Sequence, residues 1–414
     1  MFVKQKILYI AYHFPPIQVS SGVHRTLSFC RYLANHSQDV TVLTATYPAY
    51  STLSHDNHKL IPDNITVLRA YARDTARHFS VRGRYLSAMA IPDRWQSWIF
   101  GAVWRGWRHI RRHKTDMIIS TYPIASAHII GYLLHKLTGV SWIADFRDPM
   151  LQDNYPSSPG LRRVFGWIER KAVQHCKYVI FTSPGAKALY QARYPQVDDG
   201  VWQVLPNGFD ETLFNLVKPR PDKAAGTHFT LLHSGTIYPH ERDPSAFFAA
   251  LQQLKQQHPE CAAQLKVILR SSGHDALYQP MLEQLQIDDM VQLAPSLNYV
   301  EALEEMLSAD ALLLMQADNC NYQTPAKAYE YIRARKPVLA LTDAAGDTAA
   351  LIKQSGVAEL APMNDAEAIV SALIKLVSNL QTNSYRYLAD EEIARYSRDY
   401  QAEQLLKLTQ NLSL

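Results

Sequence analysis

The stretch TPAKAYEYIRARKPVLAL, residues 324–341, predicts a helix that runs directly into a buried strand. Thr324 is a natural N-cap and Pro325 suits the first helical position, so we expect the helix to begin here. The apolar run at residues 338–341 is typical of a strand whose two faces are both covered, as in a parallel sheet. A helix followed by such a strand is the repeating unit of an α/β protein.

The same alternation extends along the chain in both directions. In the first half, helical stretches separate short apolar runs at residues 6–12, 39–45, 116–121, 141–146 and 178–183. In the second half, they separate runs at residues 229–235, 265–271, 290–296, 309–317 and 336–342. We therefore expect an α/β protein with two doubly wound lobes in tandem. An interlobe cleft would face the carboxyl ends of both sheets.

The length of 414 residues fits two domains of roughly 200 residues each. Residues 215–228 contain two prolines and three basic residues without a periodic pattern, so we predict that they form a linker. The predicted domains are then residues 1–214 and residues 229–380. The remaining residues, 381–414, are predicted to be helical.

Composition and cysteine usage indicate a globular protein of a reducing compartment. Apolar residues make up 47% and charged residues 19%, with a mean hydropathy of −0.20, so the chain can bury large cores. The four cysteines lie far apart without metal-ligand spacing, which predicts reduced thiols in a cytoplasmic protein and no zinc site. The first apolar run, Ile7 to Tyr12, predicts a strand because it is too short for a signal peptide or a membrane span.

Lys327 and Glu330 lie three residues apart, so they share one face at the start of the predicted helix. The free amides of a first helical turn attract anions, and Lys327 would add a full positive charge. Glu330 could accept hydrogen bonds from two neighbouring hydroxyl groups, such as those of a ribose. These residues together predict a site for a nucleoside diphosphate. The alternative is a helix that packs on the sheet and leaves both charges in solvent.

Several further segments appear in the same order as in a known family. The chain resembles the GT-B-fold glycosyltransferases, and glycosyltransferase family 4 in particular, from Ile7 to about Ile352. The matching segments are YHFPP, SSGVHRTLSFCRYL, SWIADFRDPM, VLPNGFDETLF, LLHSGTIYPHERDPSAFFAAL, SADALLLMQ and the stretch quoted first. The resemblance implies two Rossmann-like lobes. The second would bind the nucleotide of the donor sugar, the first would bind the acceptor, and the helix in residues 381–414 would return to the first lobe.

The resemblance also assigns roles to residues of the second lobe. Glu330 matches the family's ribose-binding glutamate, and Arg242 matches a basic position at the donor diphosphate, assisted by Lys327. Gly235 lets its loop approach the phosphates closely. Many members have a glutamate where this chain has Tyr322, so the sugar contacts depart from the family's pattern. The predicted donor-binding residues are Gly22, Gly235, Arg242, Thr324, Ala326, Lys327 and Glu330.

In the first lobe, the loop FPPIQVSSGVHR (residues 14–25) leads into a helix. In the family a small-residue loop at this place contacts the donor phosphate or the acceptor. Ser21, Gly22 and Arg25 are therefore the predicted acceptor-side residues. The alternative is an ordinary helix start with Arg25 in solvent.

The segment WIADFRDP (residues 142–149) ends a buried strand in three charged residues, Asp145, Arg147 and Asp148. In the family this place lies near the reacting carbon of the sugar. Asp145 or Asp148 could orient the acceptor hydroxyl, and the predicted catalytic residues are Asp145, Arg147, Asp148, Arg242 and Lys327. The alternative is an internal Asp–Arg pair that fixes the loop, and the two roles can coexist.

No Asp-x-Asp motif occurs in the sequence, so no metal or other cofactor is expected and Arg242, Lys327 and helix amides would stabilise the leaving diphosphate. Residues 69–114 contain eleven arginines and lysines against two acids, Asp74 and Asp93. Four tryptophans lie among them, and Ile99, Val103, Trp107 and Ile110 are predicted to share a helical face. Residues 94–114 could therefore contact an anionic membrane, or the helix could cover the sheet. Nucleic acid is not an expected partner, because no nucleic-acid-binding module accompanies this stretch.

The sequence thus predicts a glycosyltransferase that moves a sugar from a nucleoside-diphosphate donor to a glycan or lipid-linked acceptor hydroxyl. The resemblance implies retention of configuration at the reacting carbon, a role in bacterial surface polysaccharide biosynthesis, and a cytoplasmic location, including the inner face of the membrane. Two alternatives stay open: a nucleotide-sugar epimerase of the same fold, and a catalytically silent nucleotide-sugar-binding protein.

Overall fold

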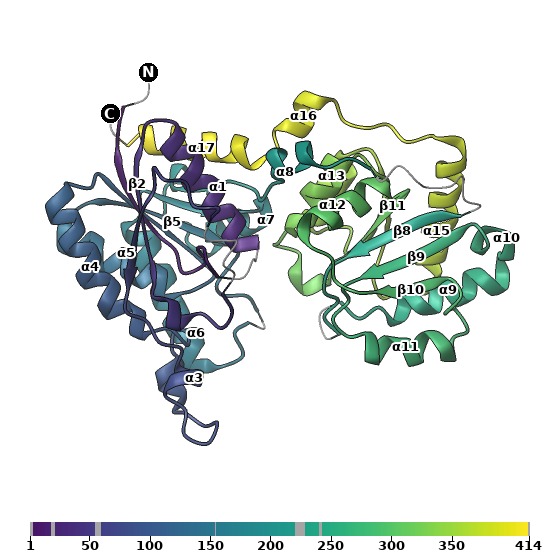
Figure 1. The fold of residues 1–414 in the computed structure, drawn as a ribbon, viewed down its shortest axis with the longest axis horizontal. Helices are drawn as coiled ribbons and strands as arrows, with labels where there is room; N and C mark the ends of the chain where they lie inside the picture. The colour runs from purple at the N-terminus through teal and green to yellow at the C-terminus, as the bar shows by residue number, and fades with distance from the viewer. Residues whose placement is uncertain are drawn as a thin grey trace. The chain divides into compact units, whose positions relative to one another are not determined.

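The computed structural model describes residues 3–17, 21–53, 59–153, 155–219, 228–239 and 242–412. The chain forms two compact units. Unit 1 comprises Met1–Asn207 with Arg398–Leu414, and unit 2 comprises Gly208–Ser397 (Figure 1). The predicted domain end at residue 214 therefore lies inside helix α8 (Glu211–Leu216) of unit 2. Of the predicted linker, residues 220–227 lie outside the described residues.

Unit 1 contains, within its described residues, a seven-stranded sheet in the order β3-β2-β1-β4-β5-β6-β7. Every pairing between these strands is parallel. The strands are β1 (Lys6–Ile10), β2 (Asp39–Ala45), β3 (Thr66–Ala70), β4 (Met117–Thr121), β5 (Ser141–Arg147), β6 (Tyr178–Phe181) and β7 (Trp202–Val204). The helices are α1 (Ser21–Asn35), α3 (Thr75–His78), α4 (Ser97–His113), α5 (Ser126–Thr138), α6 (Pro159–His175), α7 (Pro184–Arg193) and α17 (Arg398–Gln410).

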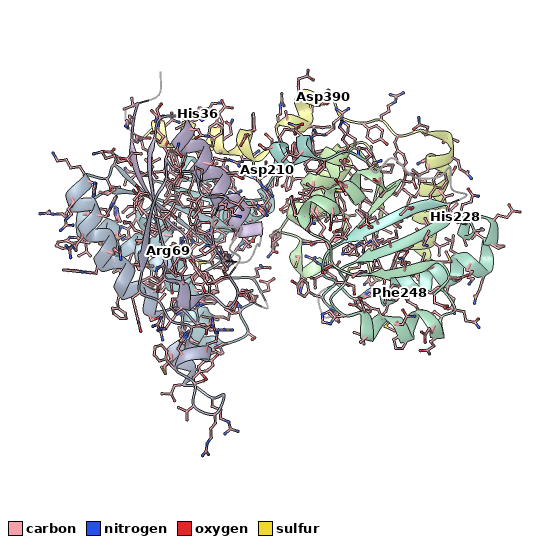
Figure 2. The ribbon with its side chains drawn as sticks, in the orientation of Figure 1. His36, Arg69, Asp210, His228, Phe248 and Asp390 are labelled. Carbon is pink, nitrogen blue, oxygen red and sulfur yellow. The ribbon has the colours of Figure 1, made fainter. Side chains whose placement is uncertain are left out.

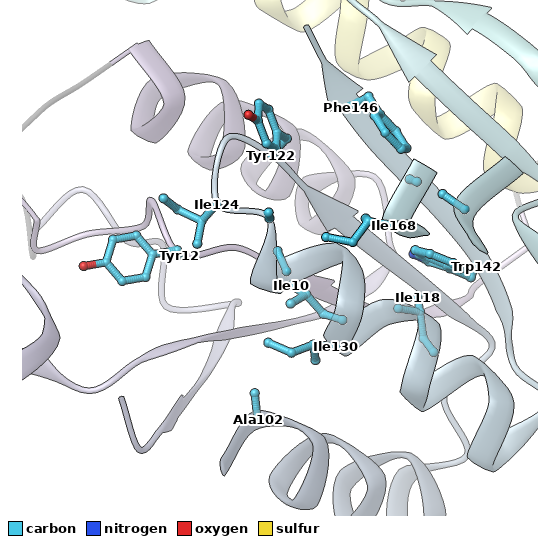
Figure 3. Close-up of a cluster of buried hydrophobic side chains, with 14 of the residues drawn as sticks. Ile10, Tyr12, Ala102, Ile118, Tyr122, Ile124, Ile130, Trp142, Phe146 and Ile168 are labelled. Carbon is cyan, nitrogen blue, oxygen red and sulfur yellow. The ribbon is translucent and has the colours of Figure 1, made fainter. Parts of the chain in front are cut away.

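Apolar side chains cover both faces of this sheet because successive residues of a strand point to opposite sides. On β1, Leu8 and Ile10 face α4, α5 and α6, and Figure 3 shows Ile10 close to Ile130 of α5. The neighbouring residues Ile7 and Tyr9 face α1 and α17 on the other side. The sheet is thus a middle layer between two layers of helices.

Unit 2 repeats this design with a six-stranded sheet among its described residues, in the order β10-β9-β8-β11-β12-β13. Its strands also pair in parallel. They are β8 (Phe229–Ser234), β9 (Leu265–Arg270), β10 (Val291–Ala294), β11 (Ala311–Met315), β12 (Val338–Leu341) and β13 (Ala358–Ala361). The remaining helices are α9 (Ser245–Gln257), α10 (Pro259–Ala262), α11 (Asp275–Gln284), α12 (Tyr299–Ser308), α13 (Ala326–Ala334), α14 (Asp347–Gln354), α15 (Ala366–Thr382) and α16 (Asp390–Ala394).

Helices cover both faces of the second sheet as well. One apolar cluster joins the sheet to α9 and α15, and Phe248 of α9, labelled in Figure 2, is fully buried in it. The opposite cluster joins the sheet to α12, α13 and α14. The predicted α/β fold with two doubly wound lobes is confirmed. Three strands that the apolar pattern did not predict, β3, β7 and β13, complete the sheets.

Two helical predictions need correction. The predicted helix over residues 381–414 is divided into α16 and α17, and only α17 belongs to unit 1, where it packs on α1. On α4, the fully buried face is Trp98, Ala102, Gly106 and Ile110. Of the predicted face, only Ile110 belongs to this buried face. Ile99, Val103 and Trp107 are partly buried and pack at the margin of the core.

None of the helices in the described part of the chain combines the length and apolar character that a membrane crossing requires. All four cysteines are free thiols. Cys30 and Cys176 are buried, while Cys261 and Cys320 are partly exposed.

Candidate functional site

In unit 2, the first turn of α13 lies beside the carboxyl end of β8. Lys327 links the two elements, because its Nζ donates a hydrogen bond to the carbonyl oxygen of Ser234 at 2.9 Å. Ser234 is the last residue of β8, and β8 pairs with β11, the strand that precedes α13. The strand order therefore places the Lys327 amine at the carboxyl edge of the sheet, where doubly wound folds bind their ligands.

Gly235 follows directly and is specified by both conformation and space. Its φ is +126°, a value that residues with a side chain rarely adopt. A Cβ at this position would lie 3.0 Å from Nζ of Lys327. The absence of a side chain thus leaves room for the Lys327 amine, while the Gly235 N–H donates to the Arg270 carbonyl at 2.9 Å.

Arg242 adds a second positive charge near Lys327. Its guanidinium carbon lies 5.8 Å from the ring centre of Tyr238, and its backbone N–H donates to the Tyr238 carbonyl at 2.7 Å. Burial and, second, the charge of Arg242 lower the pKa of Lys327 to about 8, against the opposing effect of Glu330. Two like charges held near each other raise the affinity of this place for an anion.

Glu330 lies one turn further along α13 and is partly buried. The hydroxyl of Tyr299 on α12 donates to its Oε1 at 2.6 Å. A charge-assisted bond this short fixes the carboxylate in one orientation. Tyr299 was not among the predicted site residues, because nothing in its sequence position shows which helix it faces.

His233 is a second residue near this site that was not among the predicted site residues. It is fully buried on β8, and its Nδ1 lies 3.0 Å from the Leu313 carbonyl oxygen. Since that oxygen can only accept, Nδ1 bears the hydrogen. Burial, followed by the charge of Lys327, lowers the pKa of His233 well below its ordinary value, so the ring is neutral. Its Nε2 has no hydrogen-bond partner among the described residues.

The start of α13 differs from the prediction by one residue. The helix begins at Ala326, and the N-cap is Pro325, whose ψ of 140° is extended and which provides no capping side chain. Thr324 is therefore not the N-cap, although it is buried at 5% exposure directly before the helix. The predicted donor-binding residue Ala326 is the first residue of the helix.

In unit 1, Asp145 lies in the core and forms an ion pair with Arg25. Nε and Nη2 of Arg25 lie 3.3 Å and 3.2 Å from the two carboxylate oxygens, and Thr121 Oγ1 donates to Oδ2 at 2.9 Å. Arg25 also donates to the carbonyls of Leu205 and Pro206. Asp145 and Arg25 are 1% and 4% exposed, so Arg25 is not in solvent. The internal Asp–Arg pair is observed, with Arg25 as the partner.

Arg147 points toward the start of α1. A Cβ at Gly22 would lie 2.9 Å from both Arg147 Nη1 and His13 Nδ1, so these side chains close over the glycine. Arg147 has a φ of +61° and donates to the Tyr122 carbonyl at 3.2 Å. Among the described residues, its Nε and the His13 Nδ1 have no hydrogen-bond partner. Ser21 opens α1, and its side chain lies outside the described part of the structure.

Asp148 is partly exposed, unlike Asp145. Thr182 Oγ1 donates to its Oδ1 at 3.1 Å. Burial raises its pKa, and the charge of Arg147 opposes that shift. Of the two predicted carboxylates, Asp148 is therefore the more exposed. Across the described residues, no three His, Cys, Asp or Glu side chains gather as a metal site.

The comparisons with known proteins agree with this architecture. The family model described as glycosyl transferase 4-like domain matches residues 21–208. Sucrose-phosphate synthase from Thermosynechococcus elongatus has a TM-score of 0.71 and 16% identity, with 99% of each chain covered. The Anabaena protein HepE in complex with UDP has a TM-score of 0.65 and 13% identity, with 98% of this chain and 100% of that chain covered.

A UDP-N-acetylglucosamine 2-epimerase is also similar, with a TM-score of 0.55, 13% identity, and 95% of this chain and 94% of that chain covered. A search among curated proteins found no match. At such identities the solved structures show the fold alone, and they confirm the predicted GT-B fold.

Proposed function

We propose that the protein moves a sugar from a nucleoside-diphosphate donor to an acceptor hydroxyl, because residues 21–208 match the family model described as glycosyl transferase 4-like domain. The acceptor would be a glycan or a lipid-linked saccharide. The observation that supports this proposal most is the grouping of Lys327, Arg242 and Glu330 at one edge of the unit 2 sheet. A diphosphate needs the two cations, and a ribose needs the carboxylate.

In the proposed reaction, the bond between the sugar and the diphosphate breaks while the acceptor hydroxyl attacks the same carbon with retention of its configuration, and the hydroxyl proton passes to an oxygen of the leaving diphosphate. Negative charge develops on the leaving diphosphate, and Arg242 and Lys327 stabilise it without a metal ion. The backbone amide of Ala326, in the first turn of α13, adds to this stabilisation. These residues are prepositioned, so they stabilise the transition state without reorganisation.

On the acceptor side, we assign the contacts to Asp148, Arg147 and Gly22 in unit 1. Asp148 is partly exposed and would orient the acceptor hydroxyl, while Arg147 has a buried Nε without a partner among the described residues. Asp145 and Arg25 are assigned a supporting role, because each is already occupied by the other.

The proposed setting is bacterial surface polysaccharide biosynthesis at the inner face of the cytoplasmic membrane. Residues 94–114 would make a peripheral contact with anionic lipid. In this stretch Phe100 is 81% exposed and Trp104 is 60% exposed. Aromatic side chains beside several arginines favour the interface of an anionic bilayer.

The epimerase alternative has a specific basis, since a UDP-N-acetylglucosamine 2-epimerase shares the fold. Incubation of the protein with one nucleoside-diphosphate sugar at a time, with and without acceptor extract, tests both. We expect release of nucleoside diphosphate and a new glycoside only when acceptor is present. A changed sugar that remains on the nucleotide in the donor-only reaction would instead identify an epimerase, and tight binding without any product would identify a silent binding protein.

A further inference from the structure

A cavity of about 520 Å³ lies between α4 and the carboxyl end of β3 in unit 1. It is distinct from the residues assigned to donor and acceptor. Gly101 defines its floor, because a Cβ there would lie 3.0 Å from the Tyr71 carbonyl oxygen and 3.1 Å from the Tyr71 nitrogen. The helix thus packs directly on the backbone, and longer side chains on either side of this contact form the walls.

The walls are basic and aromatic. The basic and aromatic lining residues include Tyr71, Trp104, Arg105, Arg108, His109 and Arg112. None of the lining residues, all of which the structure describes, is Asp or Glu. Arg105, Arg108 and Arg112 follow one another at helical spacing on α4, so their guanidinium groups project along one side of the helix. A cavity of this size is within the range of small-molecule sites.

Among the described residues, no ion pair joins Arg105, Arg108 or Arg112 to a carboxylate. In the described part of unit 1, the carboxylates that form ion pairs are bound to other residues: Arg25, Arg94, Arg193 and Lys407. Both acids of the basic stretch are used internally. Asp74 pairs with Arg94, and Asp93 is partly buried and accepts from the Ser126 N–H at 2.7 Å.

The arginines are positioned by contacts that leave their charge available. Arg105 Nη1 donates to the backbone carbonyl of Arg69 at 2.9 Å, and Arg69, labelled in Figure 2, donates in turn to the carbonyls of Ala45 and Pro15. The guanidinium carbon of Arg108 lies 5.8 Å from the Trp104 ring centre. Carbonyl and ring contacts orient a guanidinium group without neutralising it.

His109 adds a polar group but no charge at neutral pH. The rings of His109 and His113 stack with centres 4.4 Å apart. Burial, followed by the neighbouring His113, lowers the pKa of His109 to about 4. Arg105, Arg108 and Arg112 thus give the cavity its permanent positive charge.

We propose that this cavity binds a phosphate-bearing ligand, with Arg105, Arg108 and Arg112 contacting the phosphate and Trp104 with Tyr71 contacting the part attached to it. Arginine forks match phosphate oxygens in pairs, and an aromatic wall accepts an apolar or planar neighbour. Trp104 and Tyr71 are 60% and 52% exposed, so the cavity opens to solvent. The site belongs to unit 1 alone and does not depend on the glycosyltransferase assignment.

The phosphate could come from a soluble phosphate ester or from a phospholipid headgroup, and two binding assays distinguish these sources. Calorimetry with glycerol 3-phosphate tests the soluble source. Cosedimentation with phosphatidylcholine vesicles, with and without phosphatidylglycerol, tests the lipid source. We expect binding in at least one assay, and binding only to the phosphatidylglycerol vesicles would assign the site to a lipid headgroup.

The test variant replaces all three arginines, as Arg105→Gln, Arg108→Gln and Arg112→Gln together. We expect it to bind about 100-fold more weakly, the factor that three bases near an anionic surface supply. The matched control is Arg163→Gln with Arg170→Gln and Lys177→Gln, which removes the same charge from exposed positions elsewhere in unit 1. The control should bind within about threefold of the unaltered protein, as expected for changes distant from the site.

A single substitution, Trp104→Ala, keeps the test decisive if the triple variant does not fold. Because Trp104 is largely exposed, this variant should fold normally and still lose affinity in the same assay. The proposal is overturned if neither ligand binds to the unaltered protein. It is equally overturned if the control and the arginine variant lose the same affinity, because binding would then depend on net charge and not on the cavity.

Discussion

Replacement of Asp145 by alanine is expected to lower the free energy of unfolding of unit 1 by about 3–5 kcal/mol, because it leaves the buried Arg25 guanidinium without its counter-charge. Arg25 cannot move into solvent, since it also donates to the Leu205 and Pro206 carbonyls. The loss would thus affect the start of α1, the end of β5 and the segment after β7 together. We expect few single substitutions in unit 1 to lower the free energy of unfolding by more than Asp145→Ala does.

Tryptophan fluorescence during urea unfolding measures this change selectively. All seven tryptophans of the sequence lie in unit 1, so the signal reports that unit. The control is Glu403→Ala, which breaks an exposed pair with Lys407 at 2.8 Å on α17. It should cost only about 0.3–0.5 kcal/mol. A loss of the same small size for Asp145→Ala would contradict the structural role assigned to the Arg25–Asp145 pair.

The second large effect is expected from Arg242→Ala, which should reduce turnover about 100- to 1,000-fold while changing donor affinity less. The reason is that the charge on the leaving diphosphate grows as the bond to the sugar breaks, so a fixed cation acts mainly in the transition state. Lys327 remains in this variant and would still contact the diphosphate in the ground state. Steady-state kinetics with a matched donor and acceptor would separate the effects on kcat and KM.

The control for this experiment is Arg386→Ala, which removes an exposed arginine of unit 2. Its kinetics should equal those of the unaltered protein. If Arg242→Ala turns over at the unaltered rate, or if only KM changes, the proposed role of Arg242 at the leaving group is wrong.

Much of the fold could be predicted because the central strands are buried on both faces. Residues 311–315 and 338–341 are continuous apolar runs, and such runs have few alternatives to a parallel sheet. The strands that were not predicted lie at the sheet edges, where a strand needs fewer buried apolar side chains. β3 includes Arg69, and β13 is a four-residue strand that includes Glu359.

The candidate site could be predicted only in part, because its contacts join distant parts of the chain. The helical spacing placed Lys327 and Glu330 on one face, and the structure places the Lys327 amine on the last residue of β8. No local pattern could show that Tyr299 binds Glu330. The buried partner of Asp145 is Arg25, 120 residues away in sequence, although Arg147 lies much closer along the chain.

The cap of α13 shows a different limit of sequence reasoning. Thr-Pro favoured a cap at Thr324, yet the extended ψ of Pro325 makes the proline itself the boundary residue. A residue before proline is restricted away from the helical region, so both positions were compatible with the sequence. Local sequence preferences therefore define the first residue of a helix only to within one or two positions.

The most direct test of the central claim is calorimetric titration of a nucleoside diphosphate such as UDP into the unaltered protein and into Glu330→Gln. Our assignment predicts binding to the unaltered protein and a loss of roughly 10- to 150-fold in Glu330→Gln, because a neutral amide replaces a charge-assisted contact to the ribose. The matched variant Glu367→Gln, at an exposed position of α15, should bind normally. Equal affinity of Glu330→Gln and the unaltered protein would contradict the assignment of the donor site to α13.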